Sequence, residues 1–149
     1  MVNSTPIVIR SLVGRFPHNF RDLTMIAGTI GDYAAIIAGK DSPYNNFADL
    51  VAAYKADPSS VSIGGGSVPG GMDHLVAAMA MEAAGADPTK VKYIPFDAGG
   101  KLNAAILAGE VSAGSTGFSE AVALAKAGEM KILAVTSSKR VPAYCWNYW

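Results

Sequence analysis

The sequence predicts an α/β domain built on a mainly parallel sheet that is flanked by helices. From residue 33 onward, apolar segments of strand length alternate with segments of helical periodicity. The first of these strands, residues 33–38 (YAAIIA), is apolar throughout, as in a strand covered on both faces. Stretches rich in glycine and other small residues separate strands from helices. This alternation favours parallel strands joined by right-handed crossovers.

The clearest single element is a helix expected over residues 47–56. Its apolar residues recur at the spacing of one helical face, Asn46 is a suitable N-cap, and Asp57-Pro58 ends it. Upstream, residues 7–13 fit either a strand or a short helix, and residues 23–30 read as a strand. The other expected elements are strands at 61–63, 91–95, 111–115 and 131–136 and helices at 73–84, 101–108 and 119–127.

The composition excludes several classes of function. The chain has 149 residues with 12 basic and 12 acidic side chains, so no excess of positive charge favours nucleic acid or an anionic membrane surface as a partner. No apolar run approaches the roughly 20 residues that a membrane span needs. Cys145 is the single cysteine and has no partner for an internal disulfide. Together with only His18 and His74, which are far apart in the chain, it makes no convincing metal site.

Three small-residue stretches, each placed between a strand and a helix, predict a ligand site. They are residues 64–74 (GGGSVPGGMDH), 96–100 (FDAGG) and 116–118 (TGF). Loops that follow parallel strands meet at one edge of the sheet, where open α/β sheets bind their ligands. Glycine lets backbone N–H groups approach a ligand, and each helix start adds unpaired donors and partial positive charge. We therefore expect this edge to hold a carboxylate or a phosphate without the help of lysine.

Several side chains of these loops have candidate roles. Asp73 is expected to cap its helix, and Asp97 either orients a neighbour or rejects a second negative charge. His74 lies in the first helical turn, where it either contacts the ligand or bonds neighbouring backbone and fixes the loop. Further hydroxyl donors to an anion are Ser67, Thr116 and Ser119.

Known catalytic and nucleotide-binding motifs fit these loops poorly. A P-loop needs Gly-Lys-Ser/Thr where this chain has Gly71-Met72, and Pro69 stands where the dinucleotide fingerprint needs its third glycine. Residues 117–121 (GFSEA) nearly match a nucleophile elbow, but no histidine follows Ser119 as that fold requires. A small α/β-hydrolase-like esterase that uses Ser119 is therefore kept only as an alternative function.

Taken in order, segments of the chain resemble the substrate-binding receptors of tripartite tricarboxylate transporters, the TctC/Bug family of extracytoplasmic solute receptors. No single segment is decisive, and the GGxDH form is closest to the tricarboxylate-type members. The segments that carry the resemblance are 20–27 (FRDLTMIA), 41–44 (DSPY), 64–75 (GGGSVPGGMDHL), 93–100 (YIPFDAGG), 107–111 (LAGEV) and 127–140 (AGEMKILAVTSSKR).

The resemblance implies a lobe of the periplasmic-binding-protein type II kind, in a receptor whose two lobes close on a citrate-like di- or tricarboxylate. Such a receptor works in the periplasm and delivers its ligand to a membrane permease, with no enzyme activity and no cofactor. The ligand-binding residues that the resemblance carries over come from all three loops: Ser67, Gly70, Gly71, Asp73, His74, Asp97, Gly99, Gly100, Thr116 and Gly117.

The chain departs from the resemblance in its length, since family members are roughly twice as long. The resemblance divides it into residues 1–31 as a remnant of the first lobe with its crossover strand, 32–136 as the ligand-binding lobe, and 137–149 as a return crossing with an atypical tail, CWNYW. A single lobe is expected to bind its ligand weakly. The alternative is an excerpt without a function of its own that self-associates through uncovered apolar surface. Residues 1–6 lack the features of a signal peptide, so the chain is either cytosolic or begins after its signal.

Overall fold

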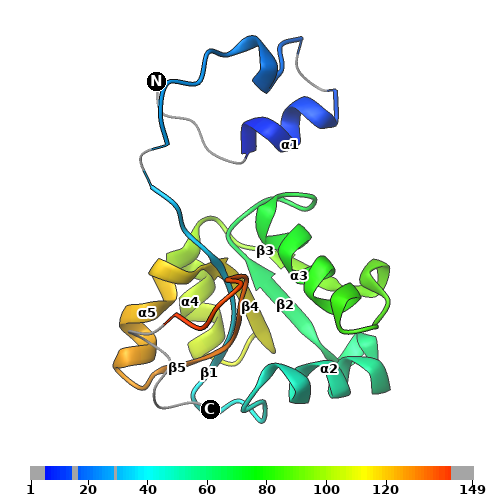
Figure 1. Ribbon diagram of the computed structural model, residues 1–149. Coiled ribbons are helices and arrows are strands. Elements are labelled where there is room, and N and C mark those ends of the chain that lie inside the picture. The colour runs from blue at the N-terminus through cyan, green and yellow to red at the C-terminus, as the bar shows by residue number, and fades with distance from the viewer. Residues whose placement is uncertain (1–5, 15–16, 29, 142–149) are drawn as a thin grey trace.

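The computed structural model describes residues 6–14, 17–28 and 30–141, and it shows a five-stranded sheet with helices on both faces (Figure 1). The predicted α/β class is therefore confirmed. The strands are β1 (Ala34–Gly39), β2 (Ser62–Gly65), β3 (Lys92–Pro95), β4 (Ala113–Gly117) and β5 (Met130–Val135). The helices are α1 (Pro6–Leu12), α2 (Phe47–Ala56), α3 (Met72–Ala83), α4 (Gly99–Leu107) and α5 (Phe118–Lys126), with 3-10 turns η1 (Phe20–Asp22), η2 (Pro58–Ser60) and η3 (Pro88–Lys90).

The directions of the strands decide which loops come together. In the spatial order β3-β2-β4-β1-β5, β2 is parallel to β3 and β4, whereas β1 is antiparallel to β4 and β5. Four strands thus run one way and β1 alone runs the other. The prediction of a mainly parallel sheet therefore holds only loosely, because β1 is antiparallel to both of its neighbours and two of the four strand pairings are parallel. The chain enters β1 at the edge where the other strands end. In register, Ala34 at the start of β1 lies opposite Gly117 at the end of β4.

Alternate residues of β1 pack into two separate hydrophobic cores. Ile36 and Ala38 pack with α2 and α3 on one face of the sheet, and Ala35 and Ile37 pack with α4 and α5 on the other. None of the four is more than 3% exposed. Burial on both faces therefore explains why this strand is apolar at every position.

Helix α2 has the predicted bounds and the predicted cap. Asn46 Oδ1 accepts the backbone N–H of Asp49 at 2.9 Å, and the side chains of Leu50, Val51 and Tyr54 are buried beneath the helix. The remaining strands and helices from residue 33 onward lie within two residues of their expected bounds. The local patterns of this part of the sequence are thus consistent with the tertiary structure.

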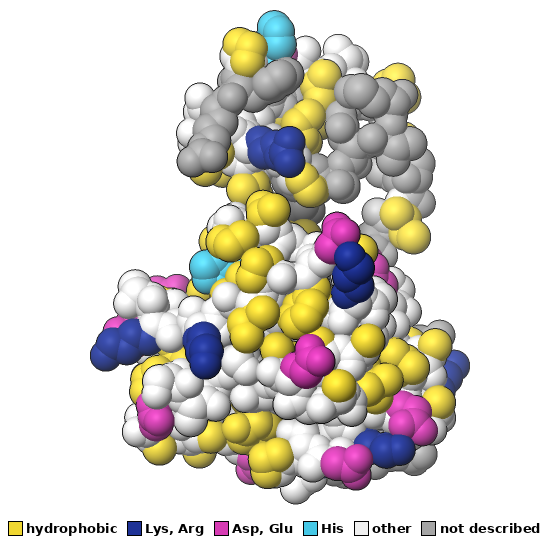
Figure 2. All heavy atoms as spheres, turned by 180° about the vertical axis from the view of Figure 1, so that it is seen from behind, with side chains coloured by type: hydrophobic (Ala, Val, Ile, Leu, Met, Phe, Trp, Pro, Cys, Tyr) yellow, Lys and Arg dark blue, Asp and Glu magenta, His cyan; other side chains and the backbone are white. Residues whose placement is uncertain are grey.

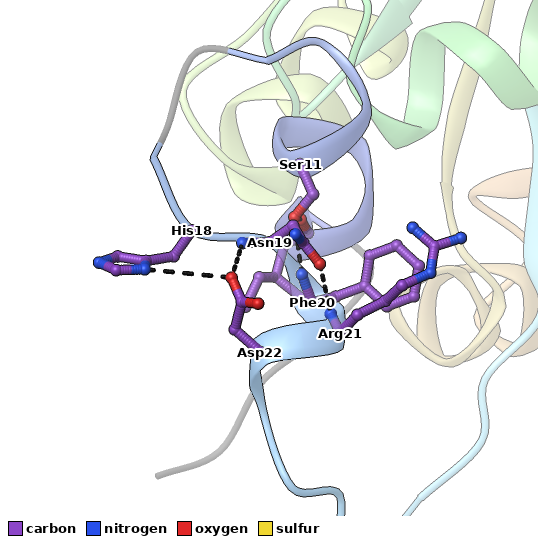
Figure 3. Close-up of polar contacts among 7 residues, drawn as sticks. Ser11, His18, Asn19, Phe20, Arg21 and Asp22 are labelled. Atoms are coloured by element: carbon purple, nitrogen blue, oxygen red, sulfur yellow. Dashed lines mark hydrogen bonds and ion pairs between the residues drawn. The ribbon is translucent and has the colours of Figure 1, made fainter.

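Residues 6–14 and 17–23 form a small segment that stands apart from the sheet (Figure 1). Helix α1 resolves the choice left open at residues 7–13, and none of its residues is buried. Ser11 Oγ accepts the N–H of Phe20 at 3.0 Å, which joins α1 to η1, and Asn19 and Asp22 form a capping box around η1 (Figure 3). None of the described residues of this segment is buried, so local polar bonds are the main contacts that hold its conformation.

The strand predicted at residues 23–30 is wrong for the part of that stretch that the structure describes. Residues 24–28 and 30 have no regular secondary structure, and Ile26 and Ile30 are 96% and 90% exposed. An apolar, β-branched stretch forms a strand only where a neighbouring strand pairs with it, and among the described residues no strand pairs with this one. The stretch instead links η1 to the start of β1 (Figure 1).

Candidate functional site

The ends of β2, β3 and β4 lie side by side at one edge of the sheet, which we call the carboxyl edge. These strands are adjacent and parallel, so the segments that follow them emerge together. The start of β1 reaches the same edge, where the N–H of Phe118 donates to the Tyr33 carbonyl at 2.6 Å. The residues that sequence reasoning assigned to three loops are therefore grouped in space.

The third predicted loop, residues 116–118, is part of a strand and a helix in the structure. Strand β4 continues to Gly117 and α5 begins at Phe118, so Thr116 and Gly117 end a strand. Gly117 is both the last strand residue and the N-cap of α5, with φ −63° and ψ 136°. An extended N-cap conformation lets a strand pass directly into a helix, and no intervening residues are needed. Both residues nevertheless remain at the carboxyl edge.

Helix α4 begins two residues earlier than expected, so Gly99 and Gly100 lie in its first turn and outside the loop. Its N-cap residue, Ala98, has φ 77° and ψ 163°, a conformation that residues with a side chain rarely adopt. The positive φ of Ala98 redirects the backbone after β3, so that α4 begins at the carboxyl edge. The N–H groups of the first turn have no partner within the helix, and Ala98 has no side chain that could accept from them.

Ser67, Asp73 and Tyr93 form a hydrogen-bonded group in the first loop. Ser67 Oγ accepts the backbone N–H of Asp73 at 3.1 Å, and Tyr93 Oη donates to the Ser67 carbonyl at 2.7 Å. The cap predicted for Asp73 is wrong, because Gly71 occupies the N-cap position and Ser67 satisfies this donor of the helix. Since Tyr93 belongs to β3, the group ties the loop after β2 to the neighbouring strand.

His74 bonds the backbone of the same loop. The N–H of Gly70 donates to His74 Nδ1 at 2.9 Å, and the imidazole ring stacks on the Tyr93 ring with centroids 4.6 Å apart. Of the two roles left open for this residue, the structure shows the bond to neighbouring backbone. His74 and Tyr93 together hold both ends of residues 67–70.

Glycines allow the three segments to touch one another. A Cβ on Gly66 would lie 3.2 Å from the backbone nitrogen of Gly99, so the first two segments are in backbone contact. A Cβ on Gly99 would lie 2.6 Å from Glu120 Oε2, and that oxygen accepts the hydroxyl of Thr116 at 2.6 Å. Helix α5 thus places a carboxylate beside the start of α4.

The charged side chains of the carboxyl edge are mostly acidic. Asp32, Asp73 and Glu120 lie there, and so does the ion pair of Asp97 with Lys101, in which Oδ2 and Nζ are 3.0 Å apart. Asp97 is 90% exposed and is bonded to its lysine, so it does not join the Ser67 group. An anion placed at this edge would depend on backbone N–H groups and would meet repulsion from the nearby carboxylates.

The environment of Asp73 shifts the pKa of its carboxyl group. Partial burial raises the pKa of Asp73, and the charge of Glu120 raises it further. Hydrogen bonds from the Ser67 hydroxyl and the Gly66 N–H act in the opposite direction, because they favour the ionised form. The ionised carboxylate is thus less favourable in the folded chain than in the unfolded one.

We expect Asp73→Asn to raise the free energy of unfolding at pH 7 and to have a smaller effect near pH 3. A carboxyl with a raised folded pKa reduces stability once the pH exceeds its unfolded value of about 3.9, and an amide avoids that loss. Urea unfolding of both chains at the two pH values measures the difference. Equal destabilisation at both pH values would show that the hydrogen bonds of Asp73 determine its contribution instead.

The three helices that begin at the carboxyl edge have no side-chain bond from their N-cap residues. Those residues are Gly71 for α3, Ala98 for α4 and Gly117 for α5. Helix α2 begins at the opposite edge, after the antiparallel strand, and it is capped by Asn46. First-turn N–H groups at the carboxyl edge therefore bond to acceptors other than N-cap side chains, such as Ser67 Oγ for Asp73 and the Tyr33 carbonyl for Phe118.

Three residues of this edge were not predicted from the sequence as part of the site: Asp32, Glu120 and Tyr93. Ser119 Oγ donates to the carboxylate of Asp32 at 2.5 Å, which ties the start of α5 to the chain entering β1. Glu120 is the third residue of α5, and its carboxylate accepts the hydroxyl of Thr116 at the end of β4. Its role depends on where the strand ends and the helix begins. The part played by Tyr93 depends on the pairing of β2 with β3, which no local pattern reveals.

A cavity of about 640 Å³ lies at the opposite edge of the sheet. It is lined by residues 39–44, 106–109, 111–112 and 129. Lys40 and Glu129 form an ion pair there, with Nζ and Oε2 2.8 Å apart. Sequence reasoning did not anticipate this cavity, and it shares no residue with the expected ligand loops.

Within the ranges that the structure describes, no group of histidine, cysteine and acidic side chains is arranged to hold a metal ion. No helix in those ranges has both the length and the apolar character of a bilayer span. On the face shown in Figure 2, acidic and basic side chains are scattered among apolar and neutral ones. Cys145 and the tail at 145–149 lie outside the described residues.

An α/β lobe with several helix starts at the carboxyl ends of its strands has the architecture of a ligand-binding domain. The sequence profile of the family described as tripartite tricarboxylate transporter family receptor, TctC, matches residues 1–145. The chain therefore belongs to this family of receptors, and the resemblance seen in the sequence is confirmed. No curated protein matches the chain.

Solved structures share the fold. A TctC solute-binding protein from Polaromonas matches with a TM-score of 0.78 and 26% identity, over 94% of this chain and 46% of that one. The periplasmic binding protein BugD matches with a TM-score of 0.64 and 28% identity, over 74% of this chain and 36% of that one. MatC from Rhodopseudomonas palustris, solved with malate, has the same fold at a TM-score of 0.64 and 16% identity, over 74% and 36%. The chain thus spans less than half the length of these structures.

The esterase alternative finds no support. The matching family consists of receptors, and a nucleophilic serine needs an adjacent general base. The Ser119 hydroxyl instead donates to the carboxylate of Asp32, and His74 is bonded to Gly70. We therefore assign Ser119 a structural role at the start of α5.

Proposed function

We propose that this chain is the ligand-binding lobe of a periplasmic solute receptor for a di- or tricarboxylate. The observation that carries the proposal is the gathering of three helix starts at the carboxyl edge, none of them bonded by an N-cap side chain. Such starts present N–H donors and partial positive charge to an anion. The residues proposed to form the ligand site, by contact or by holding its loops, are Ser67, Gly70, Gly71, Asp73, His74, Asp97, Gly99, Gly100, Thr116 and Gly117. Asp97 has the weakest support, because its exposed carboxylate is paired with Lys101.

The chemistry of the ligand is suggested by structures of the same fold. MatC was solved with malate, and a second Rhodopseudomonas palustris protein was solved with adipate. Both ligands are dicarboxylates. The carboxylates of Asp73 and Glu120 at the edge oppose a high negative charge, so within the proposed class we favour a dicarboxylate over a fully ionised tricarboxylate such as citrate.

The wider role follows from the family. We propose that residues 1–31 belong to a first lobe, that residues 32–136 form the ligand-binding lobe, and that the chain returns toward the first lobe after residue 136. The receptor would close its two lobes on the ligand in the periplasm and deliver it to the permease of a tripartite tricarboxylate transporter. In support, the chain enters the lobe at the carboxyl edge, so residues 6–14 and 17–23 lie on the ligand side of the sheet (Figure 1).

Titration calorimetry with malate, succinate, adipate and citrate tests this proposal, with succinamide as a neutral control. We expect at least one dicarboxylate to bind with a Kd of about 1 mM or below, and succinamide not to bind. The oligomeric state is measured first by size exclusion, because the exposed Ile26 and Ile30 favour self-association of the lobe. If none of the four acids gave a measurable heat of binding, the proposal would be contradicted.

A proline variant tests the role of the backbone donors. Gly100→Pro removes one N–H from the first turn of α4, at a position where an added Cβ meets nothing within 4 Å. We expect carboxylate affinity to fall about tenfold, the loss expected for one hydrogen bond to a charged group. Ala48→Pro removes the corresponding donor from α2 at the opposite edge and is expected to bind as the original chain does. Equal effects of the two variants would contradict the proposed position of the ligand.

A further inference from the structure

We propose that His74 is a positioning residue that holds the first ligand loop in place only while its imidazole is neutral. Carboxylate binding at the carboxyl edge then weakens as the pH falls through the range in which histidines titrate. This inference rests on the proposed function, since it concerns the loop assigned to the ligand.

The inference begins with the direction of one hydrogen bond. The N–H of Gly70 donates to His74 Nδ1 at 2.9 Å. A ring nitrogen accepts a hydrogen bond only while it carries no proton, so the imidazole in this arrangement is the neutral form with its proton on Nε2. Protonation of Nδ1 would set two N–H groups against each other.

The bond lies at a point where few other contacts fix the chain. Gly70 has φ +80°, and a Cβ there would meet nothing within 4 Å. The turn is otherwise closed by the N–H of Gly71, which donates to the Val68 carbonyl at 2.7 Å. Val68, Pro69 and Gly70 are all exposed. Loss of the bond to His74 therefore leaves the far end of the loop without a side-chain anchor.

The near end of the loop is anchored by a residue that does not titrate in the same range. Tyr93 Oη donates to the Ser67 carbonyl at 2.7 Å, and its ring stacks on His74 with an interplanar angle of 20°. Burial raises the pKa of the Tyr93 phenol, so it stays protonated wherever histidine titrates. A fall in pH thus releases the Gly70 end and leaves the Ser67 end in place.

The charged and aromatic groups around His74 come from three elements. Asp73 precedes it on α3, and Glu120 of α5 lies close enough to raise the pKa of Asp73. From β3, the Tyr93 ring stacks on the imidazole. Whatever these groups contribute, a proton on Nδ1 removes the acceptor for the Gly70 N–H.

Two substitutions at one position separate this role from a merely structural one. His74→Asn retains an acceptor oxygen close to the position of Nδ1 and cannot titrate, whereas His74→Ala removes the acceptor at every pH. His18→Asn is the matched control, because His18 is the other histidine of the chain and lies in the N-terminal segment. The probe is malate, measured by calorimetry at pH 8.0 and pH 5.5 with all four proteins.

We expect the affinity of the original chain and of His18→Asn for malate to fall at least fivefold between the two pH values. The affinity of His74→Asn should change only by the amount that titration of malate itself causes, and His74→Ala should bind weakly at both values. An identical pH dependence in His74→Asn and the original chain would overturn the inference. So would a His74→Ala chain that binds at pH 8.0 as tightly as the original.

A second readout needs no ligand and so distinguishes this inference from the proposed function. In NMR spectra of the unliganded chain, the Gly70 amide is expected to shift with the same midpoint as the ring protons of His74, and not to shift in His74→Asn. A Gly70 amide that does not respond while His74 titrates would overturn the inference even if malate binds. If the Gly70 amide shifts together with the His74 ring protons but malate does not bind, the role of His74 stands and only the proposed function is contradicted.

Discussion

Replacing Gly65 by alanine is expected to lower the free energy of unfolding by about 1–3 kcal/mol, the usual cost of overpacking. A Cβ at this position would overlap the Tyr93 hydroxyl and would lie 2.7 Å from Asp73 Cβ. Tyr93 can move away only by losing its bond to the Ser67 carbonyl. Asp73 Cβ can move only together with the first turn of α3. The substitution should therefore destabilise the lobe and also loosen the first ligand loop.

Gly100→Ala is the matched control for this prediction. Gly100 lies within α4, and a Cβ there would meet nothing within 4 Å. Alanine is the better helix former, so we expect a gain of about 0.5–1 kcal/mol. Urea unfolding followed by circular dichroism measures both changes. If the two variants were equally stable, the close packing described around Gly65 would be contradicted.

A larger loss, about 2–5 kcal/mol, is expected for Leu102→Ala. The Leu102 side chain is fully buried, and its Cδ1 lies 2.6 Å and 3.4 Å from where a Cβ on Gly64 and on Gly114 would stand. The Leu102 side chain packs α4 against β2 and β4, in the space left by the missing side chains of Gly64 and Gly114. Its truncation leaves a cavity beneath the helix whose start supplies donors to the proposed site.

Leu107→Ala, at the end of the same helix, is the control for Leu102. Leu107 is 47% exposed, so its loss is expected to cost less than about 1 kcal/mol. Helix propensity changes equally in the two variants, because both replace leucine by alanine inside α4. The difference between their unfolding free energies thus measures burial alone. Equal costs would show that Leu102 does not fill the space described here.

Much of the fold was predictable because local and tertiary preferences agree from residue 33 onward. The sequence YAAIIA indicates burial on both faces, and β1 is indeed covered by two helices on each side. Asn46 and the apolar spacing after it are typical of a capped amphipathic helix, and α2 has those bounds. The direction of β1 was not predictable in this way. An apolar run is the same for a parallel and an antiparallel strand, and only the path of the chain decides between them.

The details of the site were less predictable, since they depend on contacts between elements. Thr116 and Gly117 read as a loop because small residues usually mark turns, yet they complete β4, in which they pair with Ala35 and Ala34 of β1. Tyr93, which bonds the Ser67 carbonyl, belongs to β3, and Asp32, which accepts from Ser119, precedes β1. Both are distant in sequence from the residues that they bond, so no local pattern predicts their roles. Residues 23–30 show the opposite error: their composition predicts a strand, but no described strand pairs with them.

The central claim is that this lobe binds a carboxylate at its carboxyl edge. Backbone amide shifts in an NMR titration of the chain with malate, up to about 50 mM, test it most directly. The predicted result is that the largest shifts fall together in residues 66–74, 98–101 and 117–120, the segments that begin α3, α4 and α5. Shifts concentrated instead around the cavity at the opposite edge, in residues 39–44 and 106–112, would contradict the account. The absence of any shift would contradict it as well.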